Sequence, residues 1–173
     1  MAKTLKLDIP GPANRYPLVR LDDLIERSHR TARPSPGTAY DLVTVRLGGG
    51  GVVKRTSKDG AEIYPHDKKY AVAGRLIISK LDLKDGAAGI VPRHLHGAVI
   101  SGDFPQFEID TRSVLPEYLL AVLLSKSGRA WARKCSRGTT KRKRVFLPAW
   151  LESNVQLPPI TVQRKLLKQL PTR

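Results

Sequence analysis

The sequence contains one cysteine, no long hydrophobic run and few aromatic residues, and each scarcity narrows the class of protein. Cys135 has no second cysteine to pair with, so an internal disulfide is excluded, which fits a reducing cytoplasm. No apolar stretch reaches the length of a membrane span, and residues 1–4 lack the apolar core of a secretion signal. With 173 residues, 40% of them hydrophobic, the chain is long enough to bury a core. We expect a cytoplasmic protein that has one domain and a short appendage, and no membrane partner.

Acidic residues are also scarce. Lysine and arginine total 31 against 15 acidic residues, which gives a net charge of +16. Such an excess attracts polyanions over long range, and nucleic acid is the commonest polyanion in a cytoplasm. A ribosome-like protein or a merely soluble basic protein remains the alternative, so the distribution of the charge matters.

The middle of the chain has the sequence pattern of short β-strands separated by turns. Apolar and β-branched runs at 42–47, 52–55, 76–78, 88–91, 98–101 and 104–109 alternate with glycine-rich turns, including four consecutive glycines at 48–51. No Gly-Lys-Ser/Thr follows those glycines, so a nucleotide-binding loop is not indicated. This half of the chain is predicted to be a compact β-rich unit.

Helical patterns flank that unit. Leu21, Leu24 and Ile25 predict a helix at about 20–29, followed by a loop at 31–38. A second helix begins after Pro116 and is expected to end or kink at Gly128. Residues 145–147 and 155–157 are predicted strands, Trp150 and Leu151 a turn or short helix, and 160–170 an amphipathic helix.

The strongest functional signal is a basic segment at 126–144. It contains nine basic residues, and no acidic residue occurs between Glu117 and Glu152. Lysine and arginine neutralise phosphates, arginine pairs with guanine in the major groove, and glycine and hydroxyl residues let the backbone approach a phosphate. The DNA contacts predicted here are Arg133, Lys134, Arg137, Thr139, Thr140, Lys141, Arg142, Lys143 and Arg144. A more diffuse group adds Lys54, Arg55 and Lys80.

The residues give little support for catalysis. His94 and His96 lack the further ligand that a catalytic metal needs. Asp82 and Lys84, with Asp67 upstream, loosely match the acid-x-lysine ending of Mg²⁺-dependent nuclease sites, although a turn before Gly86 explains them as well. We predict no catalytic residues, no metal and no cofactor. A small nuclease and a basic protein-interaction scaffold stay open as alternatives.

Several sequence blocks follow one another over about 16–170. They are GRLIISKLD at 74–82, GAAGIVP at 86–92, GAVISGDFP at 97–105, LPEYL at 115–119 and LPPITVQRKL at 157–166. In this order they resemble the target-recognition domain of type I restriction-modification specificity subunits. The first block resembles the family pattern Gly-Asp-Leu-Ile-Ile-Ser-Lys/Arg-Ile-Asp, with Arg75 in place of the usual aspartate. Gly138 with Arg142 and Arg144 resembles the family's Gly-…-Arg segment.

The resemblance implies an α+β fold and a role. The fold would be a compact mixed α/β target-recognition domain with a twisted β-rich core at 1–157, followed by the start of a helical spacer at 158–173. The role would be recognition of one half-site in double-stranded DNA, without catalysis, for DNA methylation and phage defence. Implied partners are methyltransferase subunits, through them a translocase-nuclease subunit, and a second recognition domain or a second copy in a homodimer. On this reading Asp82 and Asp103 are structural turn residues.

Overall fold

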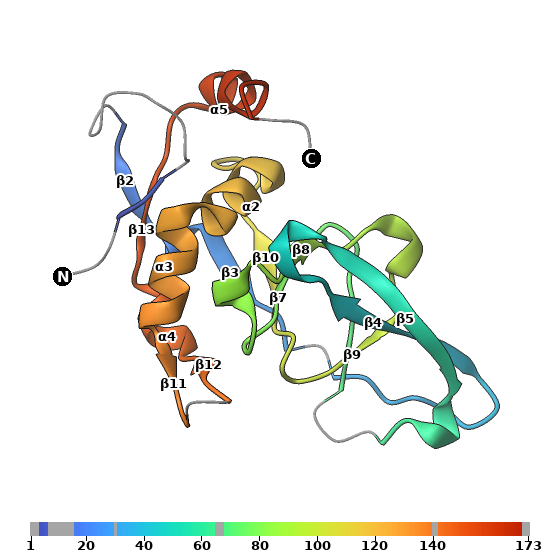
Figure 1. Ribbon diagram of the computed structural model, residues 1–173. Coiled ribbons are helices and arrows are strands. Elements are labelled where there is room, and N and C mark those ends of the chain that lie inside the picture. Colours follow the sequence, from blue (N-terminus) through green and yellow to red (C-terminus); the bar gives the residue numbers. More distant parts are fainter. Residues whose placement is uncertain (1–3, 7–15, 30, 65–67, 140–141, 171–173) are drawn as a thin grey trace.

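The computed structural model describes residues 4–6, 16–29, 31–64, 68–139 and 142–170. Over these residues the chain forms a mixed α+β fold of four small sheets and five α-helices, which confirms the predicted fold class. Figure 1 shows α2, α3 and α4 beside a central group of strands, with the long β4–β5 hairpin extending away from the helices. No helix in these ranges is long and apolar enough to cross a membrane.

The central sheet lies between two hydrophobic cores. Its order is β3-β10-β7-β8, with every neighbour antiparallel. The bounds are β3 Ile25–Arg27, β10 Gln106–Ile109, β7 Leu76–Ile78 and β8 Ala88–Ile90. Side chains alternate across a strand, and Leu76 and Ile78 join one core whereas Ile77 joins the other. Burial on both faces explains the unbroken apolar run in the sequence.

A second sheet covers the smaller core. Its order is β5-β4-β9-β6, and its bounds are β5 Val52–Asp59, β4 Ala39–Val45, β9 Val99–Ile100 and β6 Lys69–Tyr70. In the β4–β5 pair, Leu42 lies opposite Thr56 and Val43 opposite Lys54, so Arg55 is the extra residue of a β-bulge.

The glycine run between β4 and β5 packs against the chain itself. It forms the 3₁₀ turn η1, Leu47–Gly49, which lies on the turn η3, Leu83–Asp85. The Gly49 N–H donates to the Gly86 carbonyl at 2.9 Å, and a Cβ on Gly86 would lie 3.2 Å from the Gly48 Cα. Close contact between two backbones therefore explains these glycines.

A third, three-stranded sheet joins early and late parts of the chain. Its order is β1-β13-β2, with bounds β1 Thr4–Leu5, β13 Asn154–Gln156 and β2 Leu18–Arg20. The buried Leu5 and Val155 pair across it and belong to the larger core. Because the middle strand comes from the C-terminal part of the chain, this sheet closes the fold around the helices.

The break between the two central helices falls at Ser125, not at Gly128 as predicted. Helix α2, Pro116–Leu124, ends there, and Ser125 caps α3, Lys126–Lys134, by accepting a hydrogen bond from the Gly128 N–H at 3.1 Å. Gly128 lies inside α3 because the helices cross tightly: a Cβ there would lie 2.3 Å from the Leu123 carbonyl oxygen.

Two other predictions were wrong in part. The predicted helix at 20–29 is only α1, Leu21–Leu24, and at Ile25 the chain turns into β3, since pairing of Ile25 with Ile109 outweighs the helical pattern. The predicted strand at 145–147 is β12, Arg144–Val145, followed by helix α4, Leu147–Leu151. Proline in the first turn of α4 favours a helix start and lacks the N–H that a strand needs.

The C-terminal helix α5, Ile160–Leu167, is packed on the domain. Leu166 and Leu167 contact the larger core. Gln163 is fully buried: its carbonyl accepts from the Leu115 N–H at 2.8 Å, and its amide donates to the carbonyls of Ser113 and Pro158. A predicted domain boundary at residue 157 stays a prediction, and the described part of α5 contacts the preceding fold.

Candidate nucleic-acid interface

The basic segment forms a helix followed by a two-stranded ribbon. Helix α3 ends at Lys134, and after Cys135 the strands β11, Ser136–Arg137, and β12, Arg144–Val145, pair antiparallel. The Phe146 N–H donates to the Cys135 carbonyl at 2.9 Å, which extends the ladder to the end of the helix. Figure 1 shows this hairpin extending away from the helices, at the end of the molecule opposite α5.

The two faces of the ribbon differ. Ser136 and Val145 pair and face the protein: Val145 is buried, and the Ser136 hydroxyl donates to the Ala132 carbonyl at 2.8 Å. Arg137 and Arg144 form the next pair and lie on the other face. Both arginines are exposed, so this outward face is cationic.

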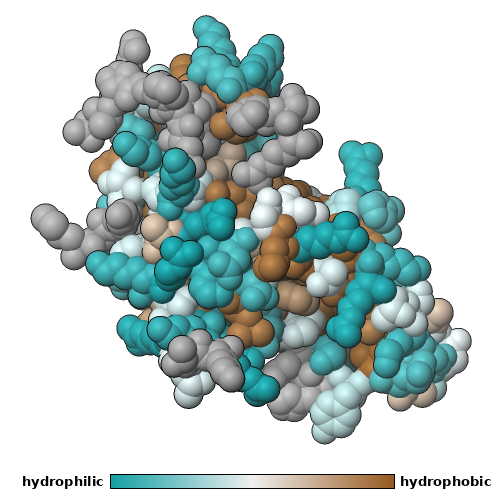
Figure 2. Space-filling view, viewed as in Figure 1, coloured by the Kyte–Doolittle hydropathy of each residue, from teal (hydrophilic) through white to brown (hydrophobic). Residues whose placement is uncertain are grey.

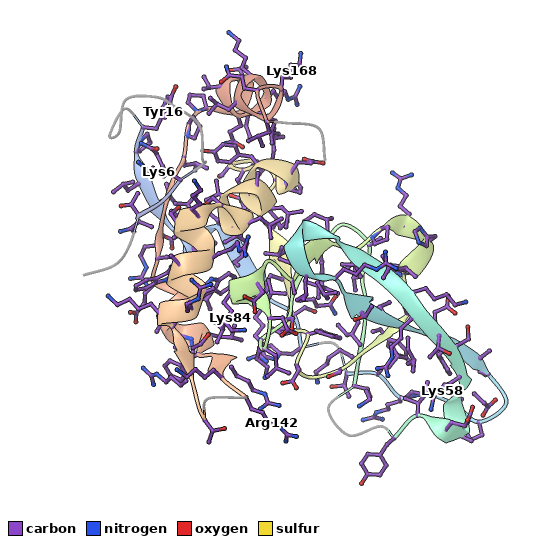
Figure 3. The ribbon with its side chains drawn as sticks, viewed as in Figure 1. Lys6, Tyr16, Lys58, Lys84, Arg142 and Lys168 are labelled. Carbon is purple, nitrogen blue, oxygen red and sulfur yellow. The ribbon has the colours of Figure 1, made fainter. Side chains whose placement is uncertain are left out.

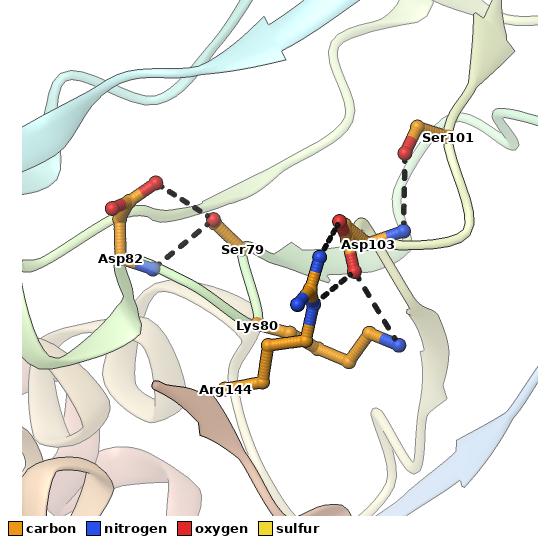
Figure 4. A network of polar contacts seen from close by, with 6 residues as sticks. All are labelled: Ser79, Lys80, Asp82, Ser101, Asp103 and Arg144. Carbon is orange, nitrogen blue, oxygen red and sulfur yellow. Dashed lines mark hydrogen bonds and ion pairs between the residues drawn. The ribbon is translucent and has the colours of Figure 1, made fainter. Parts of the chain in front are cut away.

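Asp103 fastens the base of the hairpin to the body. Its carboxylate accepts two hydrogen bonds from the Arg144 guanidinium, at 3.0 and 3.1 Å, and lies 3.7 Å from the Lys80 ammonium (Figure 4). The hydrogen bonds from Arg144, reinforced by the charge of Lys80, hold the pKa of Asp103 below its ordinary value. The Val145 N–H also donates to the Lys80 carbonyl at 2.8 Å. Two predicted DNA contacts, Lys80 and Arg144, therefore have an internal partner.

Two cations near the end of the ribbon, Arg142 and Lys143, have no carboxylate partner among the residues that the structure describes. Arg142 and Lys143 are exposed, and the Arg142 N–H donates to the Thr139 carbonyl at 3.0 Å, which closes the turn. Neither cation forms an ion pair with a described residue. Figure 3 shows the Arg142 side chain directed away from the body. The remaining predicted contacts of this loop, Thr140 and Lys141, lie outside the described residues.

Helix α3 contributes a second group of cations beside the hairpin. Arg133 and Lys134 occupy its exposed last turn, and Lys134 lies over the Trp131 ring at 5.7 Å. Both make no ion pair within the ranges that the structure describes. Arg129 is half-buried and donates to the Lys84 carbonyl, so its role is partly structural. In Figure 2, hydrophilic side chains predominate over the region of α3 and the hairpin.

The other predicted contacts lie on a separate sheet. Lys54 and Arg55 are exposed on β5, in the sheet that also carries β4. Lys54 forms a 2.7 Å ion pair with Asp41, and hydrogen bonding from Lys54 lowers the pKa of that carboxyl. Figure 3 places Lys58 of the same strand on the β4–β5 hairpin, apart from Arg142. The structure therefore brings together the predicted contacts at 133–139, those at 142–144 and Lys80, and not those from β5.

The residues of the nuclease alternative have structural partners. Asp82 accepts a hydrogen bond from the Ser79 hydroxyl at 3.1 Å and its N–H donates back to that oxygen, as in a turn. Lys84 pairs with Asp85 at 2.6 Å. Asp67 lies outside the described residues. Within the described ranges, no group of three or more histidine, cysteine or acidic side chains is arranged to hold a metal ion.

Sequence reasoning missed Phe146 and the anchoring role of Asp103. Phe146 is 39% exposed, and the Arg137 guanidinium carbon lies 3.8 Å from its ring centroid. The signal that could have revealed Phe146 is the alternation Arg144-Val145-Phe146, in which a buried valine turns both neighbours outward. No local signal connects Asp103 to Arg144, because 41 residues separate them.

Comparison with solved structures identifies the architecture. One match is the crystal structure of the HsdS subunit from Thermoanaerobacter tengcongensis, with a TM-score of 0.65 and 20% identity over 90% of this chain and 41% of that chain. This chain has the fold of part of an HsdS subunit. A second match, from work on complex assembly and conformational transition of the type I R-M system, has a TM-score of 0.58 and 14% identity over 95% of this chain and 39% of that chain.

The structural match to HsdS, the specificity subunit of a type I restriction-modification system, confirms the resemblance predicted from the sequence blocks at the level of the fold. The chain spans about two-fifths of the length of the two solved structures named above. No protein-family model matches the sequence, and no curated protein matches it.

Proposed function

We propose that this chain recognises one half-site of double-stranded DNA as the specificity component of a type I restriction-modification complex. The observation that carries the proposal is that an HsdS-like fold carries a cationic hairpin. Asp103 holds the base of this hairpin to the body, and the cations described near its end, Arg142 and Lys143, pair with no described carboxylate. The major groove of DNA is wide enough to admit a two-stranded β-ribbon such as this hairpin.

The proposed interface divides the cations by task. Arg133, Lys134, Arg142 and Lys143 contact phosphates, because they are exposed and have no carboxylate partner among the described residues. Lys80 and Arg144 mainly hold the hairpin through Asp103. Lys54 and Arg55 lie on β5 and add longer-range attraction.

Catalysis would belong to partner proteins. Methyltransferase subunits, a translocase-nuclease subunit joined through them, and a second recognition domain or a second copy of this chain would complete the complex. The HsdS-like fold supports this assignment, because one matched structure belongs to a type I R-M assembly.

The function is tested by selecting bound duplexes from a random DNA library near physiological salt, followed by sequencing. A short consensus of a few base pairs supports recognition of a half-site. Salt-sensitive binding with no enriched sequence would contradict it and favour a basic scaffold.

The interface is tested by the double variant Arg142→Ala/Lys143→Ala. Loss of two phosphate contacts should weaken binding to all sequences alike and reduce the slope of log K against log salt by about 2. The matched control is Arg164→Ala/Lys165→Ala, which removes the same charge from the exposed face of α5, at the opposite end of the molecule (Figure 1). Equal loss in both variants would show that only total charge matters.

A further inference from the structure

The outward face of the hairpin carries an arginine that is stacked on an aromatic ring. Arg137 lies opposite Arg144, and Phe146 follows directly after β12 in extended backbone, with its N–H still paired to the Cys135 carbonyl, so all three side chains share one face of the ribbon. The guanidinium carbon of Arg137 is 3.8 Å from the Phe146 ring centroid. At that distance the ring supports one face of the arginine, a cation–π contact.

Arg137 and Arg144 are neighbours, but they differ in whether their N–H donors are free to bind a ligand. The guanidinium of Arg144 donates two hydrogen bonds to the carboxylate of Asp103. Arg137 pairs with no carboxylate in the described chain. Its guanidinium carbon lies 3.8 Å from the Phe146 ring centroid, which leaves no room for a nitrogen between them, so the contact is made by the face of the guanidinium. The N–H donors of Arg137 lie in the guanidinium plane and so stay available to a ligand.

The contact with Arg137 also explains why the aromatic ring of Phe146 is exposed. Phe146 is 39% exposed, although the larger core takes in Val145 and Leu147 on either side of it. Support for Arg137 accounts for this exposure, because a stacked arginine loses less side-chain freedom on binding than a free one.

We propose that Arg137, supported by Phe146, is a specificity-determining residue that reads a guanine in the major groove of DNA. The inference rests on the proposed function. Guanine presents two acceptors, N7 and O6, on its major-groove edge, and a planar pair of arginine N–H donors matches them. The hairpin is a two-stranded ribbon that the groove admits, and Arg137 sits on its outward face, before the turn that carries Arg142 and Lys143.

The test is selection from a random library with four proteins: the unmodified chain, Arg137→Ala, Arg137→Lys and Phe146→Leu. The unmodified chain should select a consensus that contains a guanine. Arg137→Ala should lose the preference at one guanine position by about 5- to 150-fold and keep the other positions. Arg137→Lys keeps the charge but not the fork of donors, so the same position should relax. Phe146→Leu should weaken that preference to a smaller extent.

Two controls separate a base contact of Arg137 from a general effect of charge. Arg133→Ala removes one exposed cation from α3 and should lower affinity without changing the consensus. In the second control the selected guanine is replaced by 7-deazaguanine, which removes the N7 acceptor. This replacement should weaken binding of the unmodified chain by about 5-fold or more and leave the affinity of Arg137→Ala unchanged.

The outcomes are distinguishable. A consensus that Arg137→Ala leaves intact overturns the inference, makes Arg137 a phosphate contact and leaves the proposed function standing. Failure of the unmodified chain to select any consensus overturns the proposed function, and the inference with it. Thermal unfolding of each variant identifies loss of binding that is due to loss of the fold.

Discussion

Replacing Asp103 by asparagine should destabilise the protein, because Asp103 holds the hairpin through Arg144 and Lys80. The Asp103 side chain is 31% exposed, Arg144 47% and Lys80 24%, so water screens these ion pairs only in part. Exposed pairs contribute up to about 1 kcal/mol, and a bidentate arginine contributes more than a single contact. We expect a loss of about 1–2 kcal/mol in the free energy of unfolding at neutral pH.

The measurement is urea unfolding at several pH values. With a slope of about 2 kcal/mol per molar urea, the variant should unfold at about 0.5–1 M lower denaturant at pH 7. The pKa of Asp103 is lower in the folded protein than its ordinary value of about 3.9. The stabilisation is therefore complete well above that ordinary value and is lost as the pH falls through the folded pKa. The difference between variant and parent should shrink as the pH falls below about 4.

Glu152→Gln is the matched control for overall charge. It removes a carboxylate that is exposed and makes no ion pair with the residues described, on a chain of net charge +16. If Asp103→Asn and Glu152→Gln unfold at the same urea concentration at pH 7, the ion pairs of Asp103 do not hold the hairpin. A difference that persists unchanged at low pH would likewise contradict the reasoning, because a protonated aspartate no longer forms the pair.

Two further predictions concern packing. Gln163→Leu should lower the free energy of unfolding by about 2–4 kcal/mol, measured by urea unfolding, because it removes the hydrogen bonds of a fully buried amide to the Leu115 N–H and to the carbonyls of Ser113 and Pro158. Gln169→Leu, at an exposed position after α5, is the control and should change it little. Gly128→Ala should cost about 1–3 kcal/mol and lower the thermal midpoint, because its Cβ would meet the Leu123 carbonyl oxygen at 2.3 Å. A neutral result for Gly128→Ala would mean that α2 and α3 can move apart at no cost, contrary to the packing described.

The sequence pattern located most of the strands because these depend on local alternation, whereas the fold class came from the family resemblance. The apolar run at Leu76–Ile78 and the helix that follows Pro116 are local signals of this kind. The pattern failed at Ile25, where pairing with Ile109 turns a helical stretch into a strand. Such pairing depends on residues that are distant in sequence, which a local window cannot include.

The charge of the sequence predicted where the candidate site lies, but it did not predict which of its cations pair with carboxylates. A basic segment without acids predicts a cationic surface, whichever elements it forms. Whether a given cation is available depends on where carboxylates from other parts of the chain lie. Asp103 occupies Arg144 from 41 residues away, and Asp41 occupies Lys54 across the β4–β5 pair.

The distribution of partners also separates affinity from specificity within one small hairpin. Arg142 and Lys143 are exposed cations and suit phosphates, whose recognition depends on charge more than on orientation. Arg144 is fixed by a carboxylate and cannot turn to a base without breaking that pair. Among these arginines, Arg137 alone is oriented by an aromatic ring and has side-chain N–H groups that no carboxylate of the described chain accepts. A base pair is distinguished by the direction of its acceptors, so the residue whose direction is fixed before binding is the one that can discriminate.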